Sequence, residues 1–154
     1  MSPSETLVSL AEKAALAAMM QDYIAEMAQL IPGVRAGQAY PDLDLYWSEP
    51  DNRWPFWLNV DGATAGFALV DRDEGTMHMA EFFVARPYRR SRVGLGAARR
   101  LIARFPGAWR ITQRETNLPA IAFWHRVLDG FVRYEEETTA TDAVRVEQRF
   151  AIIG

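Results

Sequence analysis

The residues best suited to chemistry lie in one stretch, residues 81–105, which reads EFFVARPYRRSRVGLGAARRLIARF. An apolar segment with one carboxylate is followed there by an arginine-rich turn with two glycines and then by an apolar pattern of helical period. Backbone N–H groups in a glycine-bearing turn that opens a helix point toward one spot, and the helix dipole adds partial positive charge there. The stretch therefore predicts a strand, a turn and a helix that hold a phosphorylated ligand.

Glu81 is the candidate acid–base residue of this stretch. Strict alternation along an apolar strand puts it on one face with Met79 and Phe83. Burial raises the pKa of a carboxyl group toward the range that suits a general base. A glutamate held by a structural hydrogen bond or ion pair is the alternative interpretation, and the sequence leaves both open.

The charge of the chain is distributed unevenly. The formal net charge is -3, Lys13 is the only lysine, and seven of the arginines fall within residues 86–104. The rest of the chain is therefore acidic. A compact arginine patch suits a polyphosphate better than a membrane surface, which favours longer lysine-rich faces. The acidic remainder also argues against a nucleic-acid-binding protein.

Length and composition favour one globular domain over residues 1–154, with 49% hydrophobic and 24% charged residues. No apolar run approaches the roughly 18 residues of a membrane helix. Because cysteine is absent, disulfides, thiolate metal sites and cysteine nucleophiles are excluded. His78 and His125 lack ligand spacing, so no metal is expected. The N-terminus lacks a secretory signal pattern, so we expect a cytoplasmic protein.

The elements around the central stretch follow from periodicity and turn signals. Residues 6–10 are expected as a first strand, and Ser9 with Glu12 has the spacing of a capping box for a helix that continues to Ile31. The apolar face of that helix is predicted from Ala15, Met19, Tyr23 or Ile24, Met27 and Leu30.

An antiparallel meander and a final set of elements complete the expected fold. The meander comprises residues 56–60, 64–70 and 76–84, joined by turns at Asp61-Gly62 and Asp73-Glu74-Gly75. The later elements are a strand at 109–113, a helix at 118–128, and strands at 131–134 and 144–153. This order predicts an α/β fold with a mixed sheet of about six to seven strands and helices on both faces.

Four features, in order along the chain, resemble the GNAT superfamily of acetyl-CoA-dependent N-acetyltransferases. The strand EFFV is followed by a turn with Pro87, and the turn continues into a version of the motif Arg/Gln-x-x-Gly-x-Gly/Ala. Residues 117–124, NLPAIAFW, are similar to the helix motif N-x-x-A-x-x-F-(Y/W), and Gly130-Phe131 resembles the dipeptide that ends it. The resemblance covers nearly the whole chain and implies a splay between the fourth and fifth strands.

Two registers fit the phosphate motif. Starting at Arg89 places Arg92 where the family has glycine, whereas starting at Ser91 restores Gly94 and Gly96 but loses the initial arginine. We prefer the Arg89 register because it keeps the turn next to the strand as in the family. Arg92 then replaces a residue that allows close backbone approach to phosphates, and its side chain can add charge-assisted contacts.

The resemblance implies transfer of an acetyl group from acetyl-CoA, the co-substrate, to an amine by direct attack in a ternary complex. Glu81 would accept the proton of the amine, and the N–H of Val84 would stabilise the oxyanion that develops on the thioester. The residues implied in acetyl-CoA binding are Phe82, Phe83, Val84, Arg89, Arg90, Ser91, Arg92, Val93, Gly94, Leu95, Gly96, Asn117, Ala120, Phe123 and Trp124.

The proton donor for the leaving thiolate is open. Trp124 occupies a position where many relatives have tyrosine, and Tyr134, His125 or a water are the alternatives. On the helix after the turn, Ala97, Ala98, Leu101, Ile102 and Phe105 are expected to pack on the sheet. Arg99, Arg100 and Arg104 are expected on the opposite face.

The acceptor is expected to enter beside the first helix and the loop of residues 40–57. Acidic and aromatic residues there suit a cationic amine, and the alternative interpretation is that the aromatic residues fill the core. A small-molecule or peptide amine fits equally well.

A catalytically inactive acyl-CoA-binding regulatory module is the alternative function, which Arg92 and Trp124 favour. Because relatives often dimerise through their last strands, a homodimer is a further expectation of the resemblance.

Overall fold

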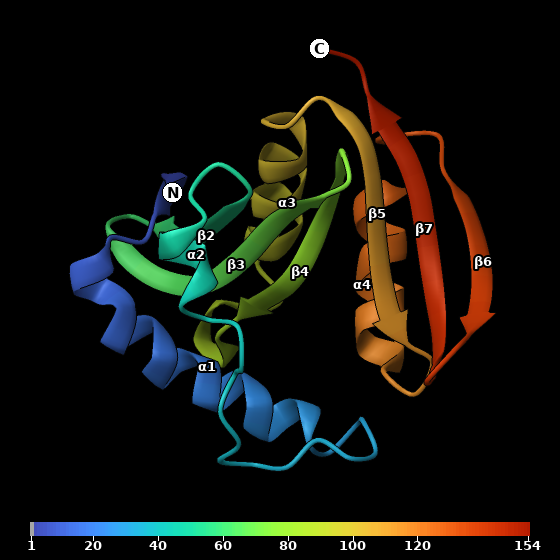
Figure 1. Cartoon of the computed structure of the whole chain (residues 1–154). Helices are drawn as coiled ribbons and strands as arrows, with labels where there is room; N and C mark the ends of the chain where they lie inside the picture. Colours follow the sequence, from blue (N-terminus) through green and yellow to red (C-terminus); the bar gives the residue numbers. More distant parts are fainter. Residues whose placement is uncertain (1) are drawn as a thin grey trace.

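The computed structural model describes residues 2–154 and contains one seven-stranded sheet in the order β1-β2-β3-β4-β5-β7-β6 (Figure 1). Neighbouring strands are antiparallel except for the parallel pair β4 and β5. The strands are β1 (Pro3–Leu7), β2 (Arg53–Val60), β3 (Ala63–Asp73), β4 (Thr76–Val84), β5 (Gly107–Arg114), β6 (Glu135–Ala140) and β7 (Val144–Ile152).

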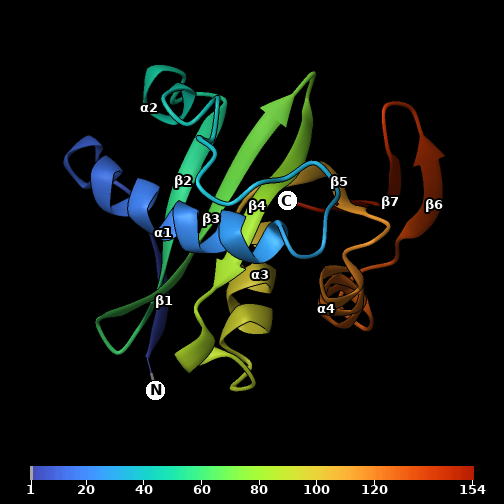
Figure 2. The same ribbon diagram turned by 90° about the horizontal axis from the view of Figure 1, so that it is seen from below.

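Helices cover both faces of the sheet, as the sequence predicts (Figures 1 and 2). One core packs α3 and α4 against strands from β2 to β7, and a second core on the other face packs α1 against β2, β3 and β4. The helices are α1 (Lys13–Met27), α2 (Leu45–Ser48), α3 (Val93–Ala103) and α4 (Leu118–Leu128), with two 3-10 turns, η1 (Leu10–Glu12) and η2 (Arg86–Tyr88).

The splay between β4 and β5 is confirmed. The two strands pair only at Met77 with Trp109 and at His78 with Arg110. Beyond His78 they diverge, so the C-terminal half of β4 has a free side that faces β5 across a gap. A parallel pair that separates in this way leaves unpaired backbone groups at the centre of the sheet.

The first helix begins as expected but turns a different face to the sheet. Glu12 Oε1 accepts a hydrogen bond from the backbone N–H of Ser9 at 3.0 Å, as the capping box requires. The fully buried side chains of α1 are Leu16, Met20 and Ile24, whereas Ala15 is exposed. The predicted stripe was therefore wrong by one position at its start, because an alanine-rich helix offers no sharp boundary between its faces.

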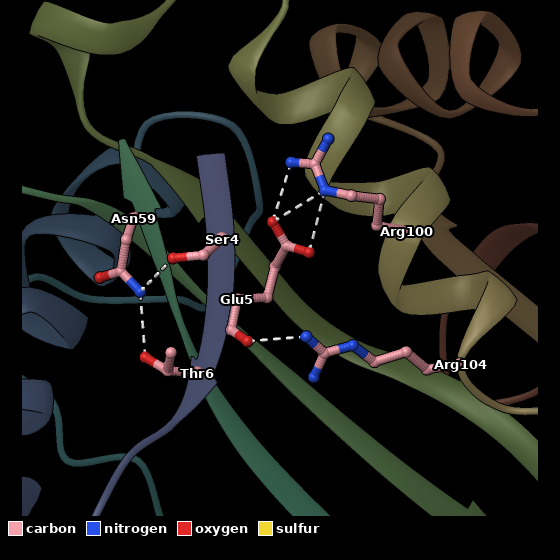
Figure 3. A network of polar contacts seen from close by, with 6 residues as sticks. All are labelled: Ser4, Glu5, Thr6, Asn59, Arg100 and Arg104. Atoms are coloured by element: carbon pink, nitrogen blue, oxygen red, sulfur yellow. Dashed lines mark hydrogen bonds and ion pairs between the residues drawn. The ribbon is translucent and has the colours of Figure 1, made fainter. Parts of the chain in front are cut away.

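The first strand covers residues 3–7 instead of 6–10 because its inward-facing residue is polar. Glu5 is only 4% exposed and accepts hydrogen bonds from Arg100 of α3 at 2.8 and 3.1 Å, while Arg104 donates to the Glu5 carbonyl at 2.8 Å (Figure 3). On the other face, Ser4 and Thr6 accept hydrogen bonds from Asn59. Glu5, paired with Arg100, occupies the buried position of β1 where the alternating hydrophobic pattern of a strand would have an apolar residue.

The strand predicted at residues 131–134 is wrong. Gly130 adopts a φ of +75°, and the N–H groups of Phe131 and Val132 donate to the carbonyl of Leu128, so these residues form the turn that ends α4. Their apolar side chains pack on the core from this turn. The strand itself is the polar segment Glu135–Ala140, which tolerates exposed side chains because it lies at the edge of the sheet.

Candidate active site

A β-bulge in β4 decides which way Glu81 points. Leu69 of β3 pairs with Glu81 and Val70 pairs with Met79, so Ala80 is an extra residue in β4. As a result Met79 packs in the core with α3 and α4, whereas Phe83 packs in the core with α1. The expectation that Met79 shares one face with Glu81 was wrong, because a bulge breaks the two-residue alternation of a strand. Phe83 does lie on the face of Glu81.

Glu81 faces α1 and the loop that follows it, where two phenols hold its carboxylate. The hydroxyl of Tyr23 donates to Oε1 at 2.6 Å, and the hydroxyl of Tyr40 donates to Oε2 at 3.0 Å. Burial raises the pKa of Glu81 above its ordinary value of 4.5, while the two phenol hydrogen bonds and nearby His78 oppose that rise. The carboxyl group is thus partly desolvated yet retains hydrogen-bond partners, which suits a general base.

The backbone of Val84 faces the gap between β4 and β5. Ala85 donates its N–H to the carbonyl of Ala65 at 2.8 Å, which continues the pairing of Gly66 with Val84 by one residue. Because hydrogen-bonded and non-hydrogen-bonded pairs alternate between antiparallel strands, the N–H of Val84 points away from β3. It therefore points into the splay, where β5 provides no partner.

Arg89 braces the end of β4 instead of extending freely into the cleft. Its Nε donates to the carbonyl of Val84 at 2.7 Å, and its Nη2 donates to Glu26 of α1 at 2.7 Å. The hydrogen bond from Arg89 lowers the pKa of Glu26. Arg89 thus connects α1, the strand end and the phosphate turn, and it fixes the peptide that follows Val84.

The arginine-rich turn adopts the backbone conformation of the glycines it lacks. Arg90 has a φ of +66° and Arg92 a φ of +63°, both in the left-handed region. Arg92 is the N-cap of α3, and the first intrahelical bond runs from Gly96 N–H to its carbonyl. The N–H groups of Val93, Gly94 and Leu95 precede that bond and form the open end of the helix, which suits phosphate oxygens.

These features meet in one cleft of about 1320 Å³ between the two halves of the sheet. Its volume exceeds the roughly 300–1,000 Å³ of a typical drug-sized site, so it has room for a large ligand and a second small one. Of the residues predicted from the sequence, the cleft is lined by Glu81, Phe82, Phe83, Val84, Arg89, Arg90, Arg92, Val93, Gly94, Leu95, Asn117, Ala120, Phe123 and Trp124.

Two predicted binding residues do not line the cleft. The Ser91 hydroxyl donates to the carbonyl of Tyr88 at 2.8 Å within the turn, and the Gly96 N–H is used inside α3. The Ser91 hydroxyl and the Gly96 N–H are thus used within the chain. Gly94 is a motif glycine in both registers, and a Cβ on it would lie 3.1 Å from Cγ2 of Val84 and 3.2 Å from Cε1 of Phe123.

Residues 16–129 match the family model described as Acetyltransferase (GNAT) family. The chain belongs to the GNAT acetyltransferase family. The resemblance of the four sequence features is thereby confirmed, and the protein is an acetyltransferase by family. A comparison with curated proteins finds no significant match.

Solved acetyltransferase structures share the fold over nearly the full chain. An acetyltransferase from Thermus thermophilus is 13% identical with a TM-score of 0.72, covering 99% of this chain and 98% of that one. The yncA protein of Salmonella typhimurium, solved with its cofactor acetyl-CoA, is 13% identical with a TM-score of 0.68, covering 100% and 96%. The ribosomal-protein-S18-alanine N-acetyltransferase from Escherichia coli is 15% identical with a TM-score of 0.66, covering 99% and 96%.

In this GNAT protein the helix α4 provides the second wall of the cleft. The ring of Phe123 stacks on that of Phe82 with centroids 5.3 Å apart, and Trp124 meets Phe82 edge-on at 5.4 Å. The Asn117 side chain caps α4 by accepting from the N–H of Ala120 at 3.3 Å, and its amide contacts Met27 of α1. The rings form an apolar wall, and Asn117 fixes the start of the helix that carries it.

The arginines of α3 have structural partners in this GNAT fold. Arg99 donates to the carbonyls of Val127, Arg126 and Asp129 at the end of α4, while Arg100 and Arg104 bind Glu5 of β1. These three arginines connect α3 to α4 and β1. The face of α3 opposite its sheet-packing face is therefore not a solvated surface along its full length, and it is not a phosphate site along its full length either. The predicted packing of Ala97, Ala98, Leu101 and Ile102 on the sheet is confirmed.

The side-chain candidates for the proton donor are directed elsewhere. The Tyr134 hydroxyl donates to Asp129 at 2.7 Å, which raises its pKa to about 12, and His125 Nε2 lies 2.6 Å from Glu136 Oε1. Neither residue lines the cleft. Neither side chain is therefore placed to protonate a thiolate in the cleft.

The aromatic residues of the loop between α1 and β2 fill the cores. Tyr46 and Trp57 are buried in the core with α1, Phe56 is buried in the core with α3, and Trp47 donates to the carbonyl of Val8. Only Tyr40 and Pro41 of residues 40–57 line the cleft. Most aromatic residues of that loop therefore fill the cores, as the alternative interpretation has it, while its first two residues reach the cleft beside Glu81. Tyr23, Tyr40 and Arg114 are the cleft residues whose roles no sequence pattern marked.

Within residues 2–154, no cluster of three or more His, Cys, Asp or Glu side chains is arranged to hold a metal ion. No helix in the same part of the chain is long and apolar enough to cross a membrane.

Proposed function

We propose that this GNAT protein transfers the acetyl group of acetyl-CoA directly to a primary amine in a ternary complex. The observation that carries the proposal is the pairing, in one cleft, of a desolvated Glu81 carboxylate with the N–H of Val84 that faces the splay. The first is placed to accept a proton and the second to stabilise an oxyanion.

The cleft fits acetyl-CoA as a substrate. The N–H groups of Val93–Leu95 at the start of α3 and the cationic side chains of Arg90 and Arg92 match the diphosphate. The stacked rings of Phe82 and Phe123 offer an apolar wall to the pantetheine arm. The thioester would then lie beside the unpaired edge of β4, within reach of the Val84 N–H.

The proposed step forms one bond and breaks one. The ammonium form of the acceptor loses a proton to the Glu81 carboxylate, directly or through one water, and the resulting amine nitrogen attacks the thioester carbonyl carbon. The oxyanion accepts a hydrogen bond from the Val84 N–H, which Arg89 steadies through the Val84 carbonyl. The C–S bond then breaks, the nitrogen releases its second proton to water as the amide forms, and the CoA thiolate leaves and takes a proton from water.

The test is a screen of amines that measures release of the CoA thiol alongside the melting temperature with acetyl-CoA. We expect acetyl-CoA to raise the melting temperature and at least one amine to trigger thiol release. A melting shift without release for any amine would favour the inactive acyl-CoA-binding module. Gly94→Asp should abolish the melting shift, because a carboxylate there crowds Val84 and Phe123 and repels phosphate at the open end of α3.

A further inference from the structure

Within residues 2–154, one face of the half-sheet formed by β5, β7 and β6 is not covered by a helix. The core under α1 includes no residue beyond Ala85, and in Figure 2 α1 lies across β1–β4 while β7 and β6 lie beyond its C-terminal end. Trp109 and Ile111 of β5 point to the core with α4. Alternation along β5 therefore puts Thr112 and Arg114 on the uncovered face, the same face of the sheet as Glu81.

Three of the four arginines that alternation puts on this face have carboxylate partners. Arg145 binds Asp142 at 2.6 Å, Arg149 binds Glu137 and Glu147, and Arg110 lies 3.8 Å from Glu147. Arg114 is partly buried and, among residues 2–154, has neither a hydrogen bond nor an ion pair from its side chain. Its partner across the strands is Arg145. Two arginines directly opposite each other repel, so a bound anion would stabilise this position.

The unpaired arginine belongs to the same cleft as the base. Arg114, Thr112 and Arg145 line the large cleft together with Glu81 and Tyr40. A second cavity of about 380 Å³ adjoins it, because Thr112 and Arg145 line both. His78 also lines this cavity, and its buried Nε2 has no hydrogen-bond partner among the residues that the structure describes. A ligand that reaches from Glu81 across the splay therefore meets Arg114, whose side chain has no partner among residues 2–154.

We propose that the acceptor is an amine that also carries a carboxylate, as in an amino acid, and that Arg114 binds this carboxylate with Thr112 beside it. The proposal rests on the proposed function, because it places the amine of the acceptor at Glu81. A planar guanidinium matches a carboxylate with two parallel hydrogen bonds, which is a stronger and more directional contact than a point charge provides. The unpaired Arg114 thus selects zwitterionic acceptors over purely cationic ones.

The experiment compares matched acceptor pairs by CoA-thiol release: each standard amino acid and its carboxamide, plus an aminoalkyl phosphate and a simple alkylamine. We expect kcat/KM for the preferred amino acid to exceed that of its amide by at least about tenfold. Arg114→Gln should raise KM for the amino acid by about tenfold or more and keep kcat/KM for the amide within about twofold. Arg114→Lys should restore part of the preference.

The matched control is Arg133→Gln, which changes an exposed arginine outside the cleft and should keep the wild-type preference. Equal rates for acid and amide, a preference that survives Arg114→Gln, or use of the phosphate or alkylamine but of no amino acid would each overturn the inference while sustaining amine acetylation. Thiol release with no amine at all would overturn the proposed function itself.

Discussion

Two regions of the cleft each hold a glutamate, and they shift the pKa of its carboxyl group in opposite directions. At the bulge of β4, Glu81 is held by the phenols of Tyr23 and Tyr40, and burial raises its pKa. Beside the phosphate turn, Glu26 is held by Arg89 and Arg86, whose hydrogen bonds and charges lower its pKa. The first region gives its carboxylate neutral hydrogen-bond donors, and the second gives its carboxylate two guanidinium partners.

The difference shows how one cleft separates binding from chemistry. A base must be able to gain a proton, and neutral hydrogen-bond donors leave that ability intact, whereas a guanidinium partner removes it. The phosphate turn needs fixed positive charge, and Glu26 orients Arg89 without neutralising Arg90 or Arg92, which have no ion pair among residues 2–154.

The largest expected effect comes from removing the base. Glu81→Gln should lower kcat by about 10²–10⁴-fold, because the amine then has no acceptor for its proton. The affinity for acetyl-CoA, measured by calorimetry, should stay at the wild-type value. Glu26→Gln is the matched variant in the second region, and we expect its kcat to fall by less than about threefold. Equal losses in the two variants would contradict the division of roles.

Removing the positive charge of Arg92 should weaken the phosphate turn and so reduce the difference between the two regions. Arg92→Gly and Arg92→Ala should both weaken acetyl-CoA binding by about tenfold, the value of one charge-assisted hydrogen bond. Only the glycine variant relieves the left-handed φ of +63°, so it alone should gain about 1 kcal/mol of stability. Calorimetry and thermal melting check the two parts, and wild-type affinity in Arg92→Gly would show that the arginine charge is unused.

Removing the phenols should shift the pH profile of the enzyme. The hydrogen bonds from Tyr23 and Tyr40 oppose the rise in the pKa of Glu81, so Tyr23→Phe or Tyr40→Phe should raise that pKa further. Because the base acts when it is ionised, the acidic limb of kcat/KM should move to higher pH in each variant. A limb that stays in place, or moves to lower pH, would indicate that another group controls the profile.

The smallest expected effect is on the pH dependence of the free energy of unfolding, and its sign is opposite for Glu81 and Glu26. Glu81 has a folded-state pKa above its ordinary 4.5, so its ionisation costs stability as pH rises from about that value through the folded pKa. Glu26 has a lowered folded-state pKa, so its contribution exists above 4.5 and is lost as pH falls through the folded pKa.

Melting curves from about pH 3 to pH 8 can compare each Gln variant with wild type. Toward acidic pH, wild type should gain stability relative to Glu81→Gln and lose stability relative to Glu26→Gln. For Glu26 the change should remain below about 1 kcal/mol, because both partners are partly exposed to solvent. The same sign in both comparisons would rule out the proposed difference in environment.

Much of the fold and of the phosphate turn could be predicted from the sequence because the signals are local. The meander, α3, α4 and β5 follow from periodicity and turn residues within short windows. The strand at residues 131–134 failed because apolar residues can pack from a turn as well as from a strand. The roles of the aromatic residues in the loop at 40–57 could not be assigned from the sequence, because aromatic residues beside acidic ones serve the core as readily as a ligand.

The sequence by itself determined the strand, turn and helix of the phosphate site, since that device is continuous along the chain and its chemistry lies in backbone conformation and charge. Only the tertiary structure decided what Glu81 does. The bulge at Ala80 turns it to the other face, and its phenol partners lie 58 and 41 residues away in the chain. A one-residue slip reverses the face of every later side chain in a strand, and no periodic pattern records where that slip occurs.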